Sequence, residues 1–190
     1  MTTTAPSPVL TRYRFSVDDF QRMGEAGIFG EDDRVELLDG EIITMNPIGG
    51  PHMTSVNRLT RRLVLALGED AIVSIQNPIV LGRHDEPQPD VVVLRSEADQ
   101  HAGKPVPDDV LLLIEVADST LAYDRDVKLP RYAQSGIPET WIVDLAGRLI
   151  TRYTEPTAEG YRVATTFRPG QAIASASLPA LQLAVADILP

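Results

Sequence analysis

Apolar residues along the chain follow two different spacings, and each spacing predicts a different kind of element. Between His52 and Gly68 they recur every three or four residues, which is typical of one face of an α-helix that ends at the glycine. The residues on this face are Val56, Leu59, Leu63 and Leu67. Elsewhere nearly continuous runs of Val, Leu and Ile predict strands that are buried on both faces. These runs are residues 89–94, 109–117 and 139–144.

Local signals add the remaining elements. Ser16 and Asp19 fit a capping box, which predicts a short helix at about 17–25. The dipeptide Asp39-Gly40 predicts a β-hairpin. The other predicted elements are a strand at 71–82, a helix at 124–136, a more exposed hairpin at 148–156 and 161–167, and an apolar segment at 178–189 on the edge of the core.

This order of elements predicts an α/β (α+β) fold with a central mixed sheet flanked by helices. We expect residues 12–190 to form one domain, and residues 1–11, which are small, polar and proline-containing, to be a disordered tail. Pro130 lies inside the predicted helix 124–136, so it must occupy the first turn or cause a kink.

Composition and charge narrow the function. The 190 residues carry 17 basic and 27 acidic side chains, a formal net charge of −10, so overall charge cannot attract nucleic acid and a local basic patch or metal ions would be needed. The sequence has no cysteine, which excludes disulfides, thiolate zinc sites and cysteine nucleophiles. No apolar run approaches the roughly 20 residues of a membrane span, and the first residues lack the pattern of a secretory signal. We therefore expect a cytoplasmic protein without a membrane segment.

Three acidic residues stand in surroundings that make a charge costly. Asp90 follows Pro89 at the start of a predicted strand, Glu115 lies near the end of another, and Glu36 lies in the hairpin. A carboxylate among apolar residues must be paired or bound to a metal. Carboxylates at the ends of neighbouring strands can converge, and such hard oxygen ligands suit Mg²⁺ or Mn²⁺. The simpler alternatives are a strand cap at Asp90, a buried salt bridge at Glu115 and a solvent-facing Glu36.

Lys128 completes a constellation that suits phosphodiester hydrolysis. It follows Glu115 by 13 residues and is in helical register with Asp124, which could hold it in place. A bound metal would polarise a phosphate oxygen and lower the pKa of a bound water. A nearby lysine could orient that water or stabilise the charge that develops on the phosphate. An ordinary helix pair between Lys128 and Asp124 is the alternative.

The ordered set of these residues resembles the Uma-type family of putative restriction endonucleases within the PD-(D/E)XK nuclease superfamily. The resemblance covers nearly the whole chain after about residue 15. The segments that carry it are 35–42 (VELLDGEI), the turn from Pro47 to His52, 88–94 (QPDVVVL), 112–120 (LLIEVADST), 123–144 and the tail after Tyr161.

The resemblance implies a restriction-endonuclease-like core and a Mg²⁺- or Mn²⁺-dependent endodeoxyribonuclease. Asp90 and Glu115 would be the metal ligands, Val116 would add its backbone carbonyl, and Glu36 would be an additional acidic residue of the site. The sequence departs from the superfamily pattern where Ala117 replaces the lysine of the E-x-K motif. Lys128 would then be a lysine relocated to the neighbouring helix.

Several further residues are candidates for the same cleft, each with a structural alternative. His52 at a predicted helix N-terminus could contact a phosphate, and Gln88 precedes the Pro-Asp motif. Arg58, Arg61 and Arg62 form the best local basic cluster and could meet DNA phosphates, although a solvated helix face is the default. Tyr132 is predicted to pack in the core rather than to take part in chemistry.

Two functions therefore remain open from the sequence. The first is the metal-dependent nuclease acting on DNA, which as a homodimer could cut both strands of a duplex. The second is a non-catalytic binding or regulatory module that retains the nuclease fold and the acidic cluster as an ion-pair network. The missing E-x-K lysine and the acidic charge favour the second, and the co-occurrence of all motif residues favours the first. A nuclease-like enzyme acting on a smaller phosphoester is a weaker third.

Overall fold

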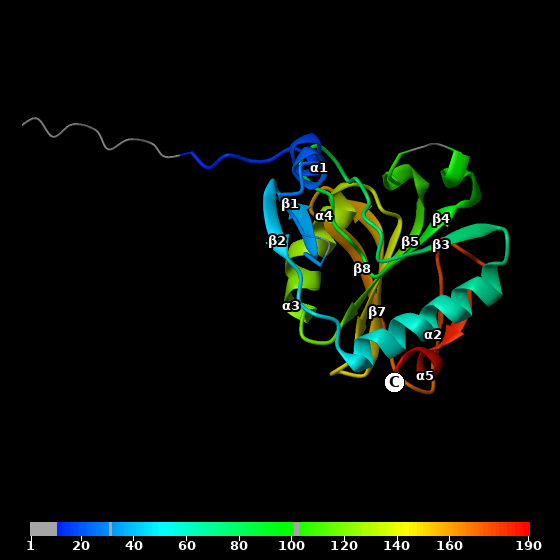
Figure 1. Ribbon diagram of the computed structural model, residues 1–190. Coiled ribbons are helices and arrows are strands. Elements are labelled where there is room, and N and C mark those ends of the chain that lie inside the picture. The colour runs from blue at the N-terminus through cyan, green and yellow to red at the C-terminus, as the bar shows by residue number, and fades with distance from the viewer. Residues whose placement is uncertain (1–10, 31, 101–102) are drawn as a thin grey trace, which may run out of the picture.

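A six-stranded mixed sheet runs through the part of the chain that the computed structural model describes, residues 11–30, 32–100 and 103–190 (Figure 1). Its strand order is β3-β4-β5-β6-β7-β8, in which β5 and β6 are parallel and all other neighbours antiparallel. The strands are β3(Ala71–Ile75), β4(Val91–Arg95), β5(Val110–Ala117), β6(Glu139–Asp144), β7(Leu149–Thr157) and β8(Gly160–Phe167). The predicted mixed sheet flanked by helices is confirmed. The tail predicted at residues 1–11 lies outside the described residues except for Thr11.

The smaller elements surround this sheet. Two two-stranded sheets pair β1(Val35–Leu38) with β2(Glu41–Thr44) and β9(Ala172–Ala174) with β10(Gln182–Ala184). The helices are α1(Val17–Glu25), α2(Gly50–Leu67), α3(Leu121–Tyr123), α4(Leu129–Gln134) and α5(Val185–Ile188), with the 3₁₀ turns η1(Ser96–Gln100) and η2(Pro107–Asp109) and the π-turn η3(Asp124–Lys128). None of the helices in the described ranges is long and apolar enough to cross a membrane.

Alternation along the buried strands sends side chains to two separate cores. On β5, Leu112, Ile114 and Val116 belong to the cluster under α2, whereas Leu113 belongs to the cluster that contains Tyr132 of α4. Because successive strand residues point to opposite faces, Glu115 shares the face of Leu113. The runs of apolar residues at 89–94 and 109–117 therefore reflect a sheet that is covered on both sides. The alternation of side chains along β5 directs Glu115 toward α4.

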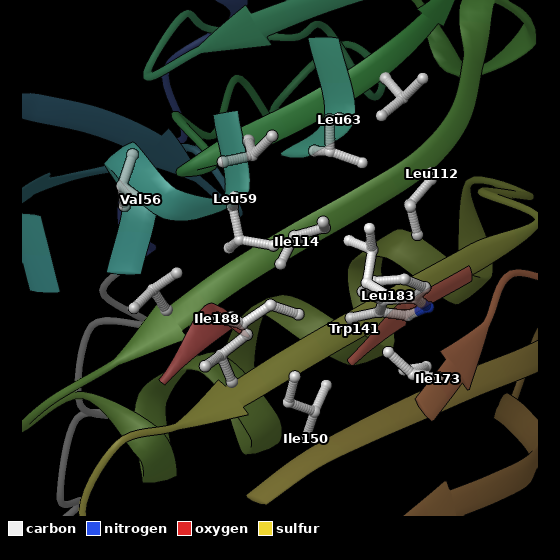
Figure 2. Packing of buried hydrophobic residues seen from close by; sticks show 14 of the residues in the cluster. Val56, Leu59, Leu63, Leu112, Ile114, Trp141, Ile150, Ile173, Leu183 and Ile188 are labelled. Atoms are coloured by element: carbon white, nitrogen blue, oxygen red, sulfur yellow. The ribbon is translucent and has the colours of Figure 1, made fainter. Parts of the chain in front are cut away.

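The C-terminal segment lies within the larger core rather than on its edge as predicted. Leu183, Val185 and Ile188 are buried in the same cluster as the apolar face of α2, and Figure 2 shows Leu183 and Ile188 among residues of α2 and the sheet. The segment closes the core because its apolar side chains cover strand residues that α2 alone leaves open. In Figure 1 the short helix α5 lies next to α2.

The hairpin β1–β2 forms as the dipeptide Asp39-Gly40 predicts. Both residues have positive φ, 52° and 73°, which a two-residue hairpin turn of this type requires. Backbone hydrogen bonds join Leu37 and Glu86 in both directions, at 3.2 Å and 2.8 Å, so the hairpin is attached to the loop before β4. This attachment fixes the position of Glu36. The apolar run predicted as one strand at 71–82 leaves the sheet after Ile75.

The predicted helix at 124–136 contains a π-turn. The N–H of Leu129 donates to the carbonyl of Asp124, five residues earlier, instead of to the usual fourth residue. Pro130 follows at once, and it has no N–H to donate to Asp126 while its ring would clash with that carbonyl in a regular helix. The proline kink anticipated from the sequence is thus accommodated by a wider turn.

Candidate functional site

Four acidic side chains and one lysine converge on a pocket of about 380 Å³ at the ends of β4 and β5. Glu36 comes from β1, Asp90 precedes β4, Glu115 lies on β5, and Asp124 and Lys128 are the two ends of the π-turn. All five line the pocket and are buried, with exposed fractions of 8% or less. The structure therefore brings together the three carboxylates, the lysine and the supporting aspartate that the sequence singled out.

Lys128 bridges two of the carboxylates. Its Nζ lies 2.9 Å from Oε1 of Glu115 and 3.2 Å from Oε2 of Glu36. Burial alone would lower the pKa of Lys128, but the surrounding carboxylates raise it overall, so the ammonium group stays charged. Asp124 accepts a hydrogen bond of 2.6 Å from the Thr120 hydroxyl and acts on Lys128 through its charge, not through the direct helix pair predicted from the sequence.

Asp90 is held as a carboxylate by donors on both of its oxygens. Its Oδ2 accepts the backbone N–H of Val116 at 2.8 Å, and its Oδ1 lies 3.0 Å from Nε2 of His52. Burial works to raise the pKa of Asp90, but the hydrogen bond and charge of His52 and the N–H of Val116 lower it overall. Val116 was predicted to offer its carbonyl to a metal, and its N–H contact places its backbone beside Asp90.

Glu115 experiences the opposite balance. Burial raises the pKa of Glu115 to about 8, an effect that the nearby aspartates reinforce and that Lys128 and Tyr132 oppose. Its Oε1 accepts a 2.5 Å hydrogen bond from the Tyr132 hydroxyl in addition to the contact with Lys128. Among the described residues, the one donor to its Oε2 is the backbone N–H of Asp90, at a long 3.3 Å.

Glu36 is held by a side chain of α3 and by the loop before β4. The hydroxyl of Tyr123 donates to its Oε1 and the backbone N–H of Gln88 to its Oε2, each at 3.1 Å. Gln88 thus reaches the site through its backbone, while its side chain donates to the carbonyl of Gln76. The predicted solvent-facing alternative for Glu36 does not hold, because its side chain is 1% exposed.

His52 lies in the first turn of α2 and lines the pocket, whereas a solvated first-turn histidine was the favoured interpretation from the sequence. While its Nε2 contacts Asp90, its Nδ1 is buried without a hydrogen-bond partner. A buried unpaired ring nitrogen is costly, so a group that enters the pocket could satisfy it. His52 can therefore contact both Asp90 and a molecule that enters the pocket.

Arg58 and Arg62 lie away from this site. Arg58 donates to the backbone carbonyl of Leu189, and Arg62 forms a 3.1 Å salt bridge with Asp187. Both arginines therefore bind the C-terminal segment and do not line the pocket. Local sequence could not show this, because the partners lie more than 120 residues further along the chain.

Two functional candidates were missed or undervalued in the sequence. Arg34 also lines the pocket, and its Nη1 donates to the carbonyl of Asn46 at 3.3 Å. Its spacing of two from Glu36 in an extended segment was the available signal, since such residues share a face. Tyr132 packs in the core as predicted, but its hydroxyl also binds Glu115.

The donor set fits a hard divalent cation. Among the described residues no group of three His, Asp or Glu side chains is arranged as a metal cluster. However, four buried acidic side chains share the pocket with a single buried lysine, so a further cation would stabilise their ionised forms. Carboxylate oxygens of Asp90 and Glu115 are the ligands that Mg²⁺ and Mn²⁺ prefer.

Comparisons with known proteins bear on the family and the fold of the chain. The family model Uma2, described as "Putative restriction endonuclease", matches residues 17–186. Among solved structures, the chain is similar to a putative nuclease belonging to DUF820 from Anabaena variabilis ATCC 29413, with a TM-score of 0.72 and 15% sequence identity over 92% of this chain and 97% of that one. No curated protein matches the sequence. The structural likeness establishes a nuclease-like fold.

Proposed function

Because the chain belongs to the Uma2 family of putative restriction endonucleases, we propose that it is a Mg²⁺- or Mn²⁺-dependent endonuclease that hydrolyses phosphodiester bonds in DNA. The observation that carries the proposal is the convergence of Asp90, Glu115 and Lys128 in one buried pocket. Restriction-endonuclease-like families generally use divalent metals. The excess of buried carboxylates gives a physical reason for the same requirement in this chain.

The cation would be held by the carboxylates of Asp90 and Glu115 and the backbone carbonyl of Val116. When bound, it supplies charge that polarises a phosphate oxygen and lowers the pKa of water. Asp90 is suited to this role because its carboxylate is already ionised and fixed at both oxygens. Glu115 is suited because its Oε2 retains acceptor capacity next to Asp90.

Lys128 provides the permanent positive charge of the site. Its ammonium group is buried and held by Glu115 and Glu36, so a phosphate or water in the pocket meets a donor whose position is fixed in advance. We assign it the orientation of the attacking water or the stabilisation of charge on the phosphate oxygens. Glu36 and Asp124 keep this lysine charged and in place.

Two further residues are assigned to substrate phosphates. Arg34 stands on the pocket wall and keeps guanidinium N–H groups beyond its single bond to Asn46. His52 lies in the first turn of α2, where the helix dipole favours an anion. Arg34 and Lys128 supply locally the positive charge that the chain as a whole lacks. We further propose that the protein acts as a homodimer when it cuts both strands of a duplex.

A specific observation keeps a non-catalytic module as the second candidate. Lys128 already neutralises Glu115 and Glu36 in a closed network, which a structural ion-pair cluster would also show. Ala117 occupies the position of the usual lysine of the motif. A binding module of this kind would recognise DNA without cutting it.

Cleavage of supercoiled plasmid separates the two. Purified wild type, Asp90→Asn and Asp126→Asn are incubated with Mg²⁺ or Mn²⁺ and with EDTA. Asp126 is an exposed aspartate of the π-turn and serves as the matched control. We expect nicking or linearisation by wild type and Asp126→Asn only, and only with the metal. Equal activity of Asp90→Asn would exclude the proposed site, and DNA binding without cleavage by the wild type would support the module.

A further inference from the structure

The two oxygens of Glu115 have very different surroundings. Oε1 accepts the Tyr132 hydroxyl at 2.5 Å and contacts Nζ of Lys128 at 2.9 Å. Within the part of the chain that the structure describes, Oε2 accepts only the 3.3 Å bond from the backbone N–H of Asp90. One oxygen is therefore saturated by the protein, and the other, which lies toward Asp90, keeps acceptor capacity.

Lys128 alone does not fix this orientation. Its ammonium group is shared with Glu36 at 3.2 Å, and an ammonium is a rotatable point charge with no preferred plane. The Tyr132 hydroxyl donates to Glu115 alone among the described residues. Its ring is fully buried and packs with Leu113 and Ile137, so the hydroxyl is held by the core itself.

The helix geometry explains why these two donors meet one carboxylate. Lys128 and Tyr132 are four residues apart, so they lie on the same face of the helix. Glu115 points to this face by strand alternation. The saturation of Oε1 thus follows from the packing of α4 on β5 and does not depend on any ligand.

We propose that Tyr132 is a positioning residue that locks the Glu115 carboxylate so that Oε2 faces the cation site beside Asp90. This inference rests on the proposed function, because it assumes that a divalent cation binds there. Tyr132 does not touch the metal or the substrate. It acts through Glu115, because its hydroxyl binds Oε1 and thereby leaves Oε2 to face the cation.

Mn²⁺ affinity, measured by calorimetry on the full-length protein, tests the proposal without reference to turnover. Tyr132→Phe removes a single oxygen and keeps the buried ring. Losing the partner that orients a metal ligand typically weakens metal affinity about 10- to 100-fold, and we expect a loss in this range. Cleavage by the variant is expected to recover as the Mn²⁺ concentration is raised, which a loss of catalytic chemistry would not allow.

Tyr161→Phe is the matched control. The Tyr161 hydroxyl is also largely buried and binds the Ile137 carbonyl and the Thr140 hydroxyl, each at 2.8 Å, away from the pocket. This variant is expected to lose stability but to bind Mn²⁺ as the wild type does. Equal Mn²⁺ affinity of Tyr132→Phe and wild type would overturn the inference while leaving the proposed function intact. A wild type that binds no Mn²⁺ would overturn both.

A second variant guards against misfolding of Tyr132→Phe. Replacing Tyr132 by 4-aminophenylalanine retains a donor at the same place on the ring, and we expect near-wild-type Mn²⁺ affinity. If this replacement binds Mn²⁺ as weakly as a Glu115→Gln variant, the hydrogen bond does not position the carboxylate and the inference is wrong.

Discussion

Asp90 and Glu115 line the same pocket, yet their pKa values shift in opposite directions. The pKa of Asp90 is lowered because His52 and a backbone N–H favour its charged form. Burial raises the pKa of Glu115 to about 8, so without a bound cation this residue holds a proton at neutral pH. A pair with such different environments is typical of a site prepared for an additional charge.

This difference predicts how stability depends on pH. The pKa of Glu115 in the folded protein lies above its ordinary value of 4.5, so the folded state holds a proton that the unfolded state releases. Its contribution to the free energy of unfolding therefore declines as pH rises from about 5 to about 8. Urea unfolding of the metal-free protein, compared with Glu115→Gln, is expected to show wild type losing stability relative to the variant over this range. A constant difference would contradict the raised pKa.

The role of Lys128 in cleavage can be tested with Lys104 as the control. The sequence has two lysines, and both pair with buried glutamates, since Nζ of Lys104 lies 2.5 Å from Oε1 of Glu86 outside the pocket. We expect Lys128→Met to retain Mn²⁺ binding and to lose about 100-fold or more in single-turnover cleavage, as with other preorganised charge donors. Lys104→Met is expected to cleave at the wild-type rate. Wild-type cleavage by Lys128→Met would remove this lysine from the mechanism.

At the scale of elements, the π-turn is what aligns the helix with the site. Tyr123, Lys128 and Tyr132 all reach carboxylates of the pocket. In a regular α-helix, residues 123 and 128 would point about 140° apart, because each residue advances the helix by about 100°. A turn closed by i→i+5 bonds covers more residues, and it returns the fifth residue to nearly the same face. π-turns are frequent at functional sites for this reason.

Replacing Pro130 tests the role of the turn. Alanine at this position restores the N–H and removes the ring that would clash with the carbonyl of Asp126, so regular α-helical bonding becomes possible and would turn Tyr123 about 140° away from Lys128. We expect Pro130→Ala to keep its circular dichroism spectrum and to lose cleavage, whereas Asp126→Asn keeps both. Full activity of Pro130→Ala would contradict an alignment of the site by the proline-induced turn.

The elements differ in how far their sequence revealed them. The buried strands and the hairpin were predictable, because continuous apolar runs and Asp39-Gly40 are local signals. The π-turn was not, since Pro130 signals an irregular helix without saying which kind. The hydroxyl contacts of Tyr123 and Tyr132 also escaped prediction, because the carboxylates they bind lie on strands far away in the sequence.

At the scale of the whole molecule, the distribution of charge matters more than its total of −10. The arginines predicted to bind DNA, Arg58 and Arg62, are engaged by the C-terminal segment. Positive charge at the pocket is left to Arg34 and Lys128, and Lys128 is buried. If the protein acts on DNA as proposed, it would therefore make few direct contacts to phosphates.

Few phosphate contacts predict a weak dependence of DNA affinity on salt. Each neutralised phosphate adds about −0.9 to the slope of log affinity against log salt for a duplex. Fluorescence anisotropy with Ca²⁺ in place of Mn²⁺ is expected to show a shallow slope that decreases in magnitude by about 1 in Arg34→Gln. Arg62→Gln is expected to leave the slope unchanged. A steep slope that depends on Arg62 would place the DNA on α2 instead.

The most direct test of the central claim is Mn²⁺ binding by wild type and Asp90→Asn, measured by calorimetry at pH 8 with Asp126→Asn as control. Donors on both oxygens of Asp90 hold it as a carboxylate with a lowered pKa, and an amide in its place cannot neutralise a cation. The proposed site predicts binding to wild type and Asp126→Asn and its loss in folded Asp90→Asn. Unchanged Mn²⁺ affinity in Asp90→Asn would contradict it.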